Sequence, residues 1–125
     1  LEEFKIFLED DVFIAHDIKF DYKFISESFE KYNLGKLENR KLCTIDLSKR
    51  TILAQRYGLD FLKNLLNIDI EGQHRAYVDA LSTTYIFEHA LKQIPTTIQT
   101  TEDLIDFSKS DNILKQPKKE EKRVN

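Results

Sequence analysis

The sequence lacks methionine and tryptophan, and it has one cysteine, two prolines and three glycines. Because it begins at Leu1 and contains no methionine, we expect it to be a piece of a longer protein. The lone Cys43 excludes an intramolecular disulfide, and no apolar run approaches the roughly 20 residues that span a bilayer. The first ten residues also lack the charged-then-apolar layout of a signal peptide. A reducing cytoplasmic setting without membrane contact fits these features best.

An excess of positive charge is absent as well. The chain has 19 Lys and Arg against 22 Asp and Glu, which gives a formal net charge of -3. Any contact with nucleic-acid phosphates must therefore come from local basic residues or bound cations, and the net charge neither supports nor excludes DNA. Hydrophobic residues make up 41% of the 125 residues, which is enough for one folded domain with a single core.

The first part of the chain alternates between helix and strand patterns. Apolar residues within 1–9 are spaced as on a helix, and residues 12–15 form a short β-favouring run. Such a run is typical of a central strand that is buried on both faces of a parallel sheet. The amphipathic segment 20–32 predicts a helix, with Asp17 available as its N-cap and Gly35 following its end.

The same alternation continues toward the C-terminus. Residues 42–45 predict a second strand, and the segment up to Leu66 predicts one or two helices broken near Gly58. Residues 75–93 predict a long helix that ends before Pro95. Its predicted apolar face comprises Ala76, Ala80, Thr83, Phe87, Ala90, Leu91 and Ile94. We therefore expect an α/β fold with helices packed on the faces of the sheet.

The composition changes after Pro95. Thr, Ser, Asp and Lys dominate, apart from one weak amphipathic stretch at Leu104, Ile105 and Phe107, and residues 118–123 are all charged. We therefore predict a folded domain over residues 1–94 and a polar linker or tail over residues 95–125.

Polar residues cluster where the first predicted strand leads into a helix. They are His16, Asp17 and Asp21, and ligand sites in α/β folds gather at such carboxyl ends of strands. Asp21 has the apolar neighbours Phe20 and Phe24, so burial of its carboxylate requires a cation, a hydrogen-bond donor or water. Alternatively, the two acids merely occupy the first turn of a helix and His16 is a partly buried, hydrogen-bonded residue.

A second cluster extends from His74 to Asp79 and leads into the long helix. With His74 just before the helix, the spacing of five residues places the two side chains about 7–8 Å apart along the axis. This is far enough to hold a metal-bound water between a general base and a metal ligand. The alternative is a histidine near a helix start and an ordinary surface carboxylate, and each cluster in isolation favours its structural explanation.

Together the two clusters resemble a known pattern. Residues 12–94 look like the latter two-thirds of the DEDDh 3′–5′ exonuclease superfamily and are similar to the proofreading epsilon subunit of bacterial DNA polymerase III. The second family motif, apolar-His-Asn-x-x-Phe-Asp, matches residues 14–21, and the third, His-x-Ala-x-x-Asp-Ala, matches residues 74–80. The resemblance implies a ribonuclease H-like fold.

The resemblance also implies a mechanism. The terminal phosphodiester bond of DNA would be hydrolysed with two Mg²⁺ or Mn²⁺ ions, held in part by Asp21 and Asp79, and His74 would be the general base. Oxygen ligands suit such cations. His16, Asp17 and Arg75 are weaker candidates for substrate binding. The implied partners are a single-stranded 3′ end and a DNA polymerase catalytic subunit.

Two departures from the family pattern bear on activity. Asp17 stands where the family commonly has Asn, which adds a negative charge near the site. The first family motif, an Asp-x-Glu on the first strand, is absent from the sequence, and the N-terminal strands of the fold would be absent with it. We therefore expect this polypeptide alone to be inactive, whereas its parent protein is an exonuclease.

Two other functions remain open at this point. The parent protein could instead be a related exonuclease that trims RNA, because no residue in the sequence can be assigned to recognition of a 2′-hydroxyl group. The chain could also be a non-catalytic module that only binds a polymerase. Retention of His74 with both aspartates argues against such a module, and the absence of the first motif favours it.

Overall fold

The computed structural model describes residues 11–72 and 75–115 of the chain. These ranges contain two short strands and five helices in a mixed α/β arrangement. The elements are β1 (Phe13–Ala15), α2 (Ile18–Lys31), β2 (Lys41–Cys43), α3 (Thr44–Thr51), α4 (Leu59–Leu65), α5 (Arg75–Leu91) and α6 (Thr101–Ser108). The strands pair in parallel, with Phe13 opposite Lys41 and Ala15 opposite Cys43.

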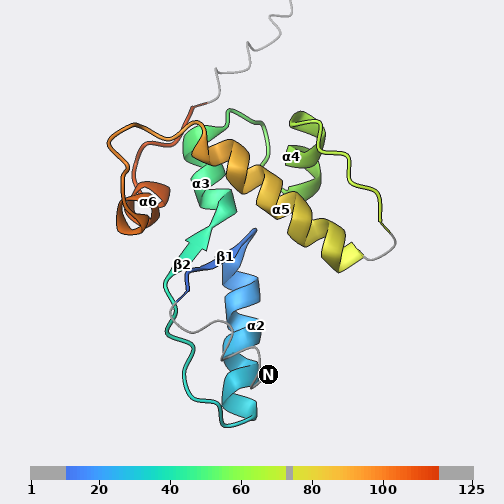
Figure 1. Ribbon diagram of the computed structural model, residues 1–125, viewed down its shortest axis with the longest axis vertical. Helices are drawn as coiled ribbons and strands as arrows, with labels where there is room; N and C mark the ends of the chain where they lie inside the picture. Colours follow the sequence, from blue (N-terminus) through green and yellow to red (C-terminus); the bar gives the residue numbers. More distant parts are fainter. Residues whose placement is uncertain (1–10, 73–74, 116–125) are drawn as a thin grey trace, which may run out of the picture.

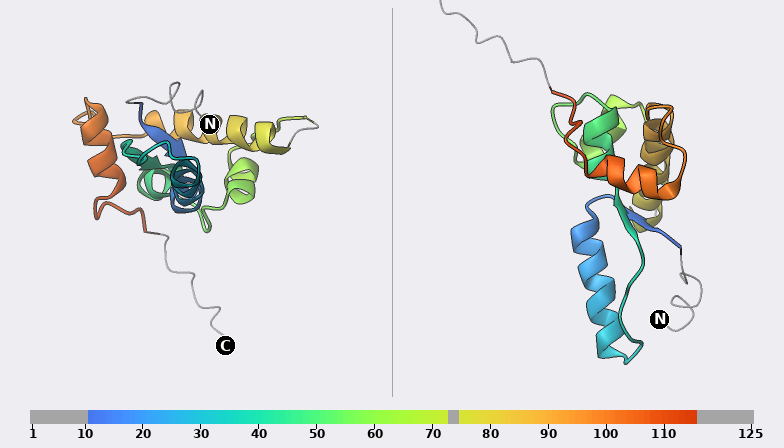
Figure 2. Two further views of the ribbon diagram at one scale, coloured as in Figure 1. Left: turned by 90° about the horizontal axis from the view of Figure 1, so that it is seen from below. Right: turned by 90° about the vertical axis from the view of Figure 1, so that its left-hand side faces the viewer.

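The strand pair joins two packed parts of the molecule. Figure 1 shows α2 extending from one side of the strands, whereas α3, α4, α5 and α6 gather at their carboxyl ends, and Figure 2 shows the same separation from the side. We call β1, α2 and the chain up to Leu37 the α2 unit, and α3 to α6 the helical unit. α2 packs on both strands, and Phe29 and Leu37 are buried between them.

The helical unit holds two larger apolar clusters. One contains Leu42, Leu47, Ala90, Ile105 and Phe107, and it joins β2, α3, α5 and α6. The other contains Ile52, Ala54, Leu62 and Ile86, and it fixes α4 against α5 and the loop after α3. The core of the described chain therefore lies to one side of the strands, and α5 belongs to both clusters.

Several expectations from the sequence are confirmed. Helix α2 covers most of residues 20–32, α5 begins at Arg75, and the segment between β2 and residue 66 forms two helices. Gly58 is the N-cap of the second of these, and Gly35 has a φ of 86° in the turn after α2. The helix expected within residues 1–9 lies outside the described residues. None of the described helices is long and apolar enough to cross a membrane.

The strand predictions were only partly correct. β2 ends at Cys43, and the expected strand residues Thr44 and Ile45 begin α3 instead. β1 was expected to be buried on both faces, but Ile14 is 42% exposed, and β1 pairs with β2 alone within the described ranges. The β-favouring side chains of both segments were compatible with either outcome, since packing decides such short runs.

The predicted apolar face of the long helix was also displaced. The buried residues of α5 are Ser82, Ile86 and Ala90, whereas Ala76 and Ala80 are exposed. The true core face lies about a quarter-turn away from the predicted one. It was hidden because it includes Ser82, whose hydroxyl is satisfied inside the helix by donating to the Val78 carbonyl at 2.6 Å.

The segment after Pro95 differs from the expected linker or tail. It contains α6, which begins with a capping box between Thr100 and Asp103. Ile105 and Phe107 of this helix are only 7% and 8% exposed, and they pack on the core of the helical unit. The polar composition of the segment indicated a linker, but the apolar side chains of Ile105 and Phe107 are enough to dock α6 on the core.

This packing predicts unequal effects of two matched substitutions. Ile105→Ala should lower the free energy of unfolding by about 3 kcal/mol, as expected for a buried isoleucine. Ile113→Ala should cost less than about 0.5 kcal/mol, because Ile113 is 48% exposed. Urea denaturation of the two variants and of the unsubstituted chain measures both changes in the free energy of unfolding. Equal effects of the two changes would show that α6 is not part of the core.

Candidate active site

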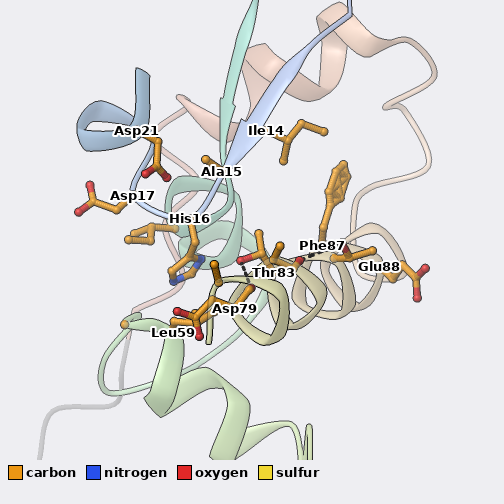
Figure 3. A pocket seen from close by; sticks show the side chains of 15 residues that line it. Ile14, Ala15, His16, Asp17, Asp21, Leu59, Asp79, Thr83, Phe87 and Glu88 are labelled. Carbon is orange, nitrogen blue, oxygen red and sulfur yellow. Dashed lines mark hydrogen bonds between the residues drawn. The ribbon is translucent and has the colours of Figure 1, made fainter. Parts of the chain in front are cut away.

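An open groove of about 910 Å³ lies where the α2 unit meets the helical unit. Its walls come from β1, the start of α2, the start of α4 and one face of α5. The lining residues are Ile14, Ala15, His16, Asp17, Asp21, Ile45, Gly58, Leu59, Ala76, Asp79, Ala80, Thr83, Thr84, Phe87 and Glu88. Figure 3 shows Asp17, Asp21 and Asp79 around His16, with Ile14 and Phe87 away from this acidic end. Both sequence clusters therefore contribute to one groove.

Asp21 lies in the first turn of α2 and is partly buried at the groove. Burial raises the pKa of this carboxyl above its ordinary value of 3.8, and the negative charge of Asp17 raises the pKa further. Both causes disfavour the ionised form of Asp21. A bound cation or a hydrogen-bond donor would have the opposite effect, so the site favours a positively charged ligand.

Asp17 occupies the N-cap position of α2, but its side chain does not cap the helix. Its backbone is left-handed, with a φ of 64° and a ψ of 62°, a conformation that Asp tolerates better than most residues. The side chain is exposed at the groove. Asp17 is the N-cap residue of α2, as the sequence predicted, but the expected capping hydrogen bond of its side chain is not formed.

His16 is held by two hydrogen bonds within the chain. Its Nδ1 lies 2.7 Å from Thr44 Oγ1, and its Nε2 lies 2.7 Å from the Tyr57 carbonyl oxygen. Burial lowers the pKa of His16 from its ordinary value of 6.5, although the Tyr57 bond and the charge of Asp17 act in the other direction. Contact with a substrate would require one of these bonds to break.

Asp79 lies on α5 at the same end of the groove as His16. Its side chain is partly buried, and its backbone carbonyl accepts a hydrogen bond from the Thr83 hydroxyl at 2.9 Å. His74, the expected general base, lies outside the described residues. The groove therefore brings together Asp21 and Asp79, and the position of His74 relative to them stays a prediction.

A second, shallower depression of about 700 Å³ shares Asp79 with the groove. It is also lined by Arg75, at the start of α5, and by Arg56, in the loop before α4. Both arginines are exposed, and within the described ranges neither forms an ion pair with a carboxylate. Two exposed guanidinium groups therefore lie near Asp79.

The carboxylates of the groove suit a divalent cation in part. Asp21 and Asp79 offer oxygen ligands, which Mg²⁺ and Mn²⁺ prefer. Across residues 11–72 and 75–115, however, no three His, Cys, Asp or Glu side chains are grouped so that they could share one ion. The donor chemistry fits, and a complete set of protein ligands would need further residues.

Sequence reasoning missed some of the groove and one of the arginines. Gly58 was given a structural role only, as the break between two helices, and Arg56 was not singled out. The groove face of α5, formed by Ala76, Ala80, Thr83 and Phe87, belongs to the apolar face predicted from the sequence. Part of the predicted apolar face of α5 therefore lines an opening, whereas the sequence predicted that this face packs on the sheet.

The family is established by comparison with known proteins. A family model described as "Exonuclease" matches residues 1–87, which include the whole groove apart from Glu88. The chain belongs to the exonuclease family, within the DEDDh superfamily. This confirms the resemblance drawn from the two motifs.

Curated relatives of this exonuclease chain are named "DNA polymerase III PolC-type". Those of Staphylococcus saprophyticus and Staphylococcus haemolyticus are each 36% identical over 96 residues, and that of Staphylococcus aureus is 35% identical over the same length. Each alignment covers 75% of this chain and 7% of the relative. The chain thus spans a small part of the length of the curated relatives it matches. No solved structure matched it.

The electrostatics of the groove predict a specific effect of Asp17→Asn. This change should lower the pKa of Asp21, because it removes one of the two causes that raise it. The pKa should stay above 3.8, since the burial of Asp21 is the larger cause and is unchanged. Titration of the Asp21 carboxyl carbon by NMR measures this value. Asp60→Asn, outside the groove, should leave it unchanged, and an Asp17→Asn variant with an unaltered Asp21 pKa would contradict the account.

Proposed function

We propose that the parent protein is a 3′–5′ exonuclease that hydrolyses the terminal phosphodiester bond of DNA and proofreads DNA replication. One observation carries this proposal: Asp21 and Asp79, which belong to different sequence motifs, line the same groove. The membership of the chain in the exonuclease family and its similarity to polymerases named PolC-type support it.

The described chain forms the latter part of a ribonuclease H-like domain in this proposal. The first strands, with the Asp-x-Glu motif, would belong to the parent protein and would supply the remaining acidic ligands. The 42% exposure of Ile14 on β1 supports this, because a strand inside a larger sheet would have such an apolar side chain covered. The chain alone is then inactive for lack of half the ligands.

Each site residue has a chemical role. Asp21 and Asp79 would hold Mg²⁺ or Mn²⁺, and in a complete site such ions would stabilise the negative charge on the attacking and leaving oxygens. His74 removes the proton from the attacking water. The raised pKa of Asp21 supports a cation-binding role, since a positive charge beside the carboxylate compensates the effects of burial and of Asp17.

The second depression, which Arg56 and Arg75 line beside Asp79, is the proposed path of the DNA backbone. Arg75 and Arg56 bind phosphates of the strand next to the scissile bond, which compensates for the net negative charge of the chain. Asp17 lies close enough to the groove to influence the substrate or the ions. His16 is not assigned to substrate binding, because both of its ring nitrogens are already hydrogen-bonded within the chain.

The polymerase catalytic subunit is the proposed partner, and the cytoplasm is the proposed compartment. The similarity to PolC-type polymerases supports the first, and the buried free thiol of Cys43 is compatible with the second. A non-catalytic role as a polymerase-binding module is the second candidate. The absence of a three-ligand cluster from the described ranges favours it.

Hydrolysis of a labelled single-stranded oligonucleotide distinguishes these functions. The parent protein with its upstream sequence should shorten the strand stepwise from its 3′ end in Mg²⁺, and Asp79→Ala should reduce the rate by roughly a hundredfold or more. His74→Ala should have a comparable effect because the proton acceptor is lost.

Asp106→Ala is the matched control, since Asp106 is exposed on α6 and lines neither the groove nor the depression beside it. This variant should retain most of the activity. Absence of hydrolysis by the parent protein on DNA and RNA would favour the binding module, whereas hydrolysis of RNA alone would change the substrate.

The arginines predict a change in the salt dependence of DNA binding. Arg75→Ala should weaken binding of single-stranded DNA and reduce the slope of log affinity against log salt by about 0.7, the value for one lost phosphate contact. Fluorescence anisotropy in Ca²⁺, across a series of salt concentrations, measures this slope. Arg40→Ala should leave it unchanged, because Arg40 pairs with Glu102 away from the groove. If the unsubstituted protein and Arg75→Ala have the same slope, Arg75 does not contact a phosphate of the bound strand.

A further inference from the structure

The two aspartates of the groove belong to different packed parts of the molecule. Asp21 is on α2, which packs on the two strands through the small cluster around Phe29. Asp79 is on α5, which packs on α3 and α4. Neither apolar cluster of the helical unit includes a residue of α2. The separation of the two carboxylates therefore depends on how the α2 unit is fixed to the helical unit.

His16 lies at the junction of these two parts. It directly follows β1 and comes two residues before α2, so it belongs to the α2 unit. Both of its hydrogen-bond partners belong to the other side: Thr44 is the first residue of α3, and Tyr57 precedes the N-cap of α4. The imidazole thus bridges the two units at the acidic end of the groove.

The partners of His16 define its tautomer. The Tyr57 carbonyl can only accept, so Nε2 carries a proton and donates to it at 2.7 Å. Thr44 Oγ1 lies 2.7 Å from Nδ1 and 3.3 Å from the Ala15 carbonyl, and in the neutral imidazole its hydroxyl donates to the nearer acceptor, Nδ1. A neutral imidazole satisfies both bonds at once, which agrees with burial lowering the pKa of His16.

Both partners are themselves firmly held. The Tyr57 hydroxyl donates to the Ile52 carbonyl at 2.7 Å and accepts from the Ala54 amide at 3.3 Å, which closes the loop between α3 and α4. Thr44 is 1% exposed. The residues after Tyr57, Gly58 and Leu59, line the groove together with Asp79. A bond to Tyr57 therefore positions the groove wall itself.

We propose that His16 is a positioning residue that fixes the distance between Asp21 and Asp79 by tying the β1–α2 turn to Thr44 and to the Tyr57 loop. This role deepens the proposed exonuclease function and rests on it for its consequence, which is divalent-cation affinity. His16 acts through the two aspartates and makes no contact with the reacting atoms. Loss of the bridge loosens the α2 unit and separates the ligands.

Two measurements on the parent protein test this role. The first is the distance between spin labels at Lys23→Cys on α2 and Tyr85→Cys on α5, both exposed positions, in a Cys43→Ala background. The second is the dissociation constant of Mn²⁺, measured by the loss of the free-ion EPR signal. His16→Phe keeps a flat ring but removes both hydrogen bonds, and Thr44→Val removes one of them. Thr44→Ser restores the hydroxyl.

His16→Phe should broaden the label-to-label distance distribution and weaken Mn²⁺ binding by up to roughly thirtyfold, the combined effect of losing two neutral hydrogen bonds. Thr44→Val should change both readouts in the same direction, and Thr44→Ser should restore them. If His16→Phe does not fold, the Thr44 pair gives the same comparison. Unchanged distances and unchanged Mn²⁺ affinity in the variants that fold would overturn the positioning role.

The outcome also separates this role from the proposed function. If the wild-type protein binds no Mn²⁺, or if Asp79→Ala binds it equally well, the proposed metal site is wrong. The distance measurement still decides whether His16 braces the two units in that case. If Mn²⁺ binding depends on Asp79 and is indifferent to both His16 and Thr44, the exonuclease proposal stands and the role of His16 is wrong.

Discussion

The parallel pairing of β1 with β2 is the constraint on which the rest of the structure depends. Its register places Ala15 opposite Cys43, so the next residues, His16 and Thr44, leave the sheet side by side and form a hydrogen bond of 2.7 Å. From this edge the chain continues into α2 on one side and α3 on the other. Helices α2 and α3 diverge from this edge of the sheet. The acidic end of the groove lies beside the point where they diverge, and α5 forms its other wall.

The surroundings of Asp21 in that gap disfavour its ionised form. Asp17, Asp21 and Asp79 line one groove, and the pKa of Asp21 is raised by burial and by the neighbouring Asp17. Carboxylates at such a site are costly unless a positive charge joins them. The proposed metal-dependent hydrolysis of phosphodiesters would supply that charge, since the same cations would also offset the phosphates of a bound strand. The same charges would be a liability in a module that only binds protein.

The sequence predicted the parts of this site that lie on strongly patterned elements. Asp21 and Asp79 were found because each lies within a family motif near the start of a predicted helix, and helices α2 and α5 lie close to the predicted ranges. The exposure of Ile14 and the true core face of α5 were not predictable, because both depend on which neighbours cover them. The bonds of His16 to Thr44 and Tyr57 join residues far apart in the chain, so no local pattern reveals them. The docking of α6 was missed because the amphipathic stretch at Leu104, Ile105 and Phe107 is short and lies within a polar segment.

The most direct test of the central claim is a crystal structure of the parent protein grown with Mn²⁺ and measured at the manganese absorption edge. The account predicts an anomalous peak between the carboxylates of Asp21 and Asp79, with acidic residues from upstream of Leu1 completing the ligands. A peak that contacts neither aspartate, or no peak in the groove at saturating Mn²⁺, would contradict it.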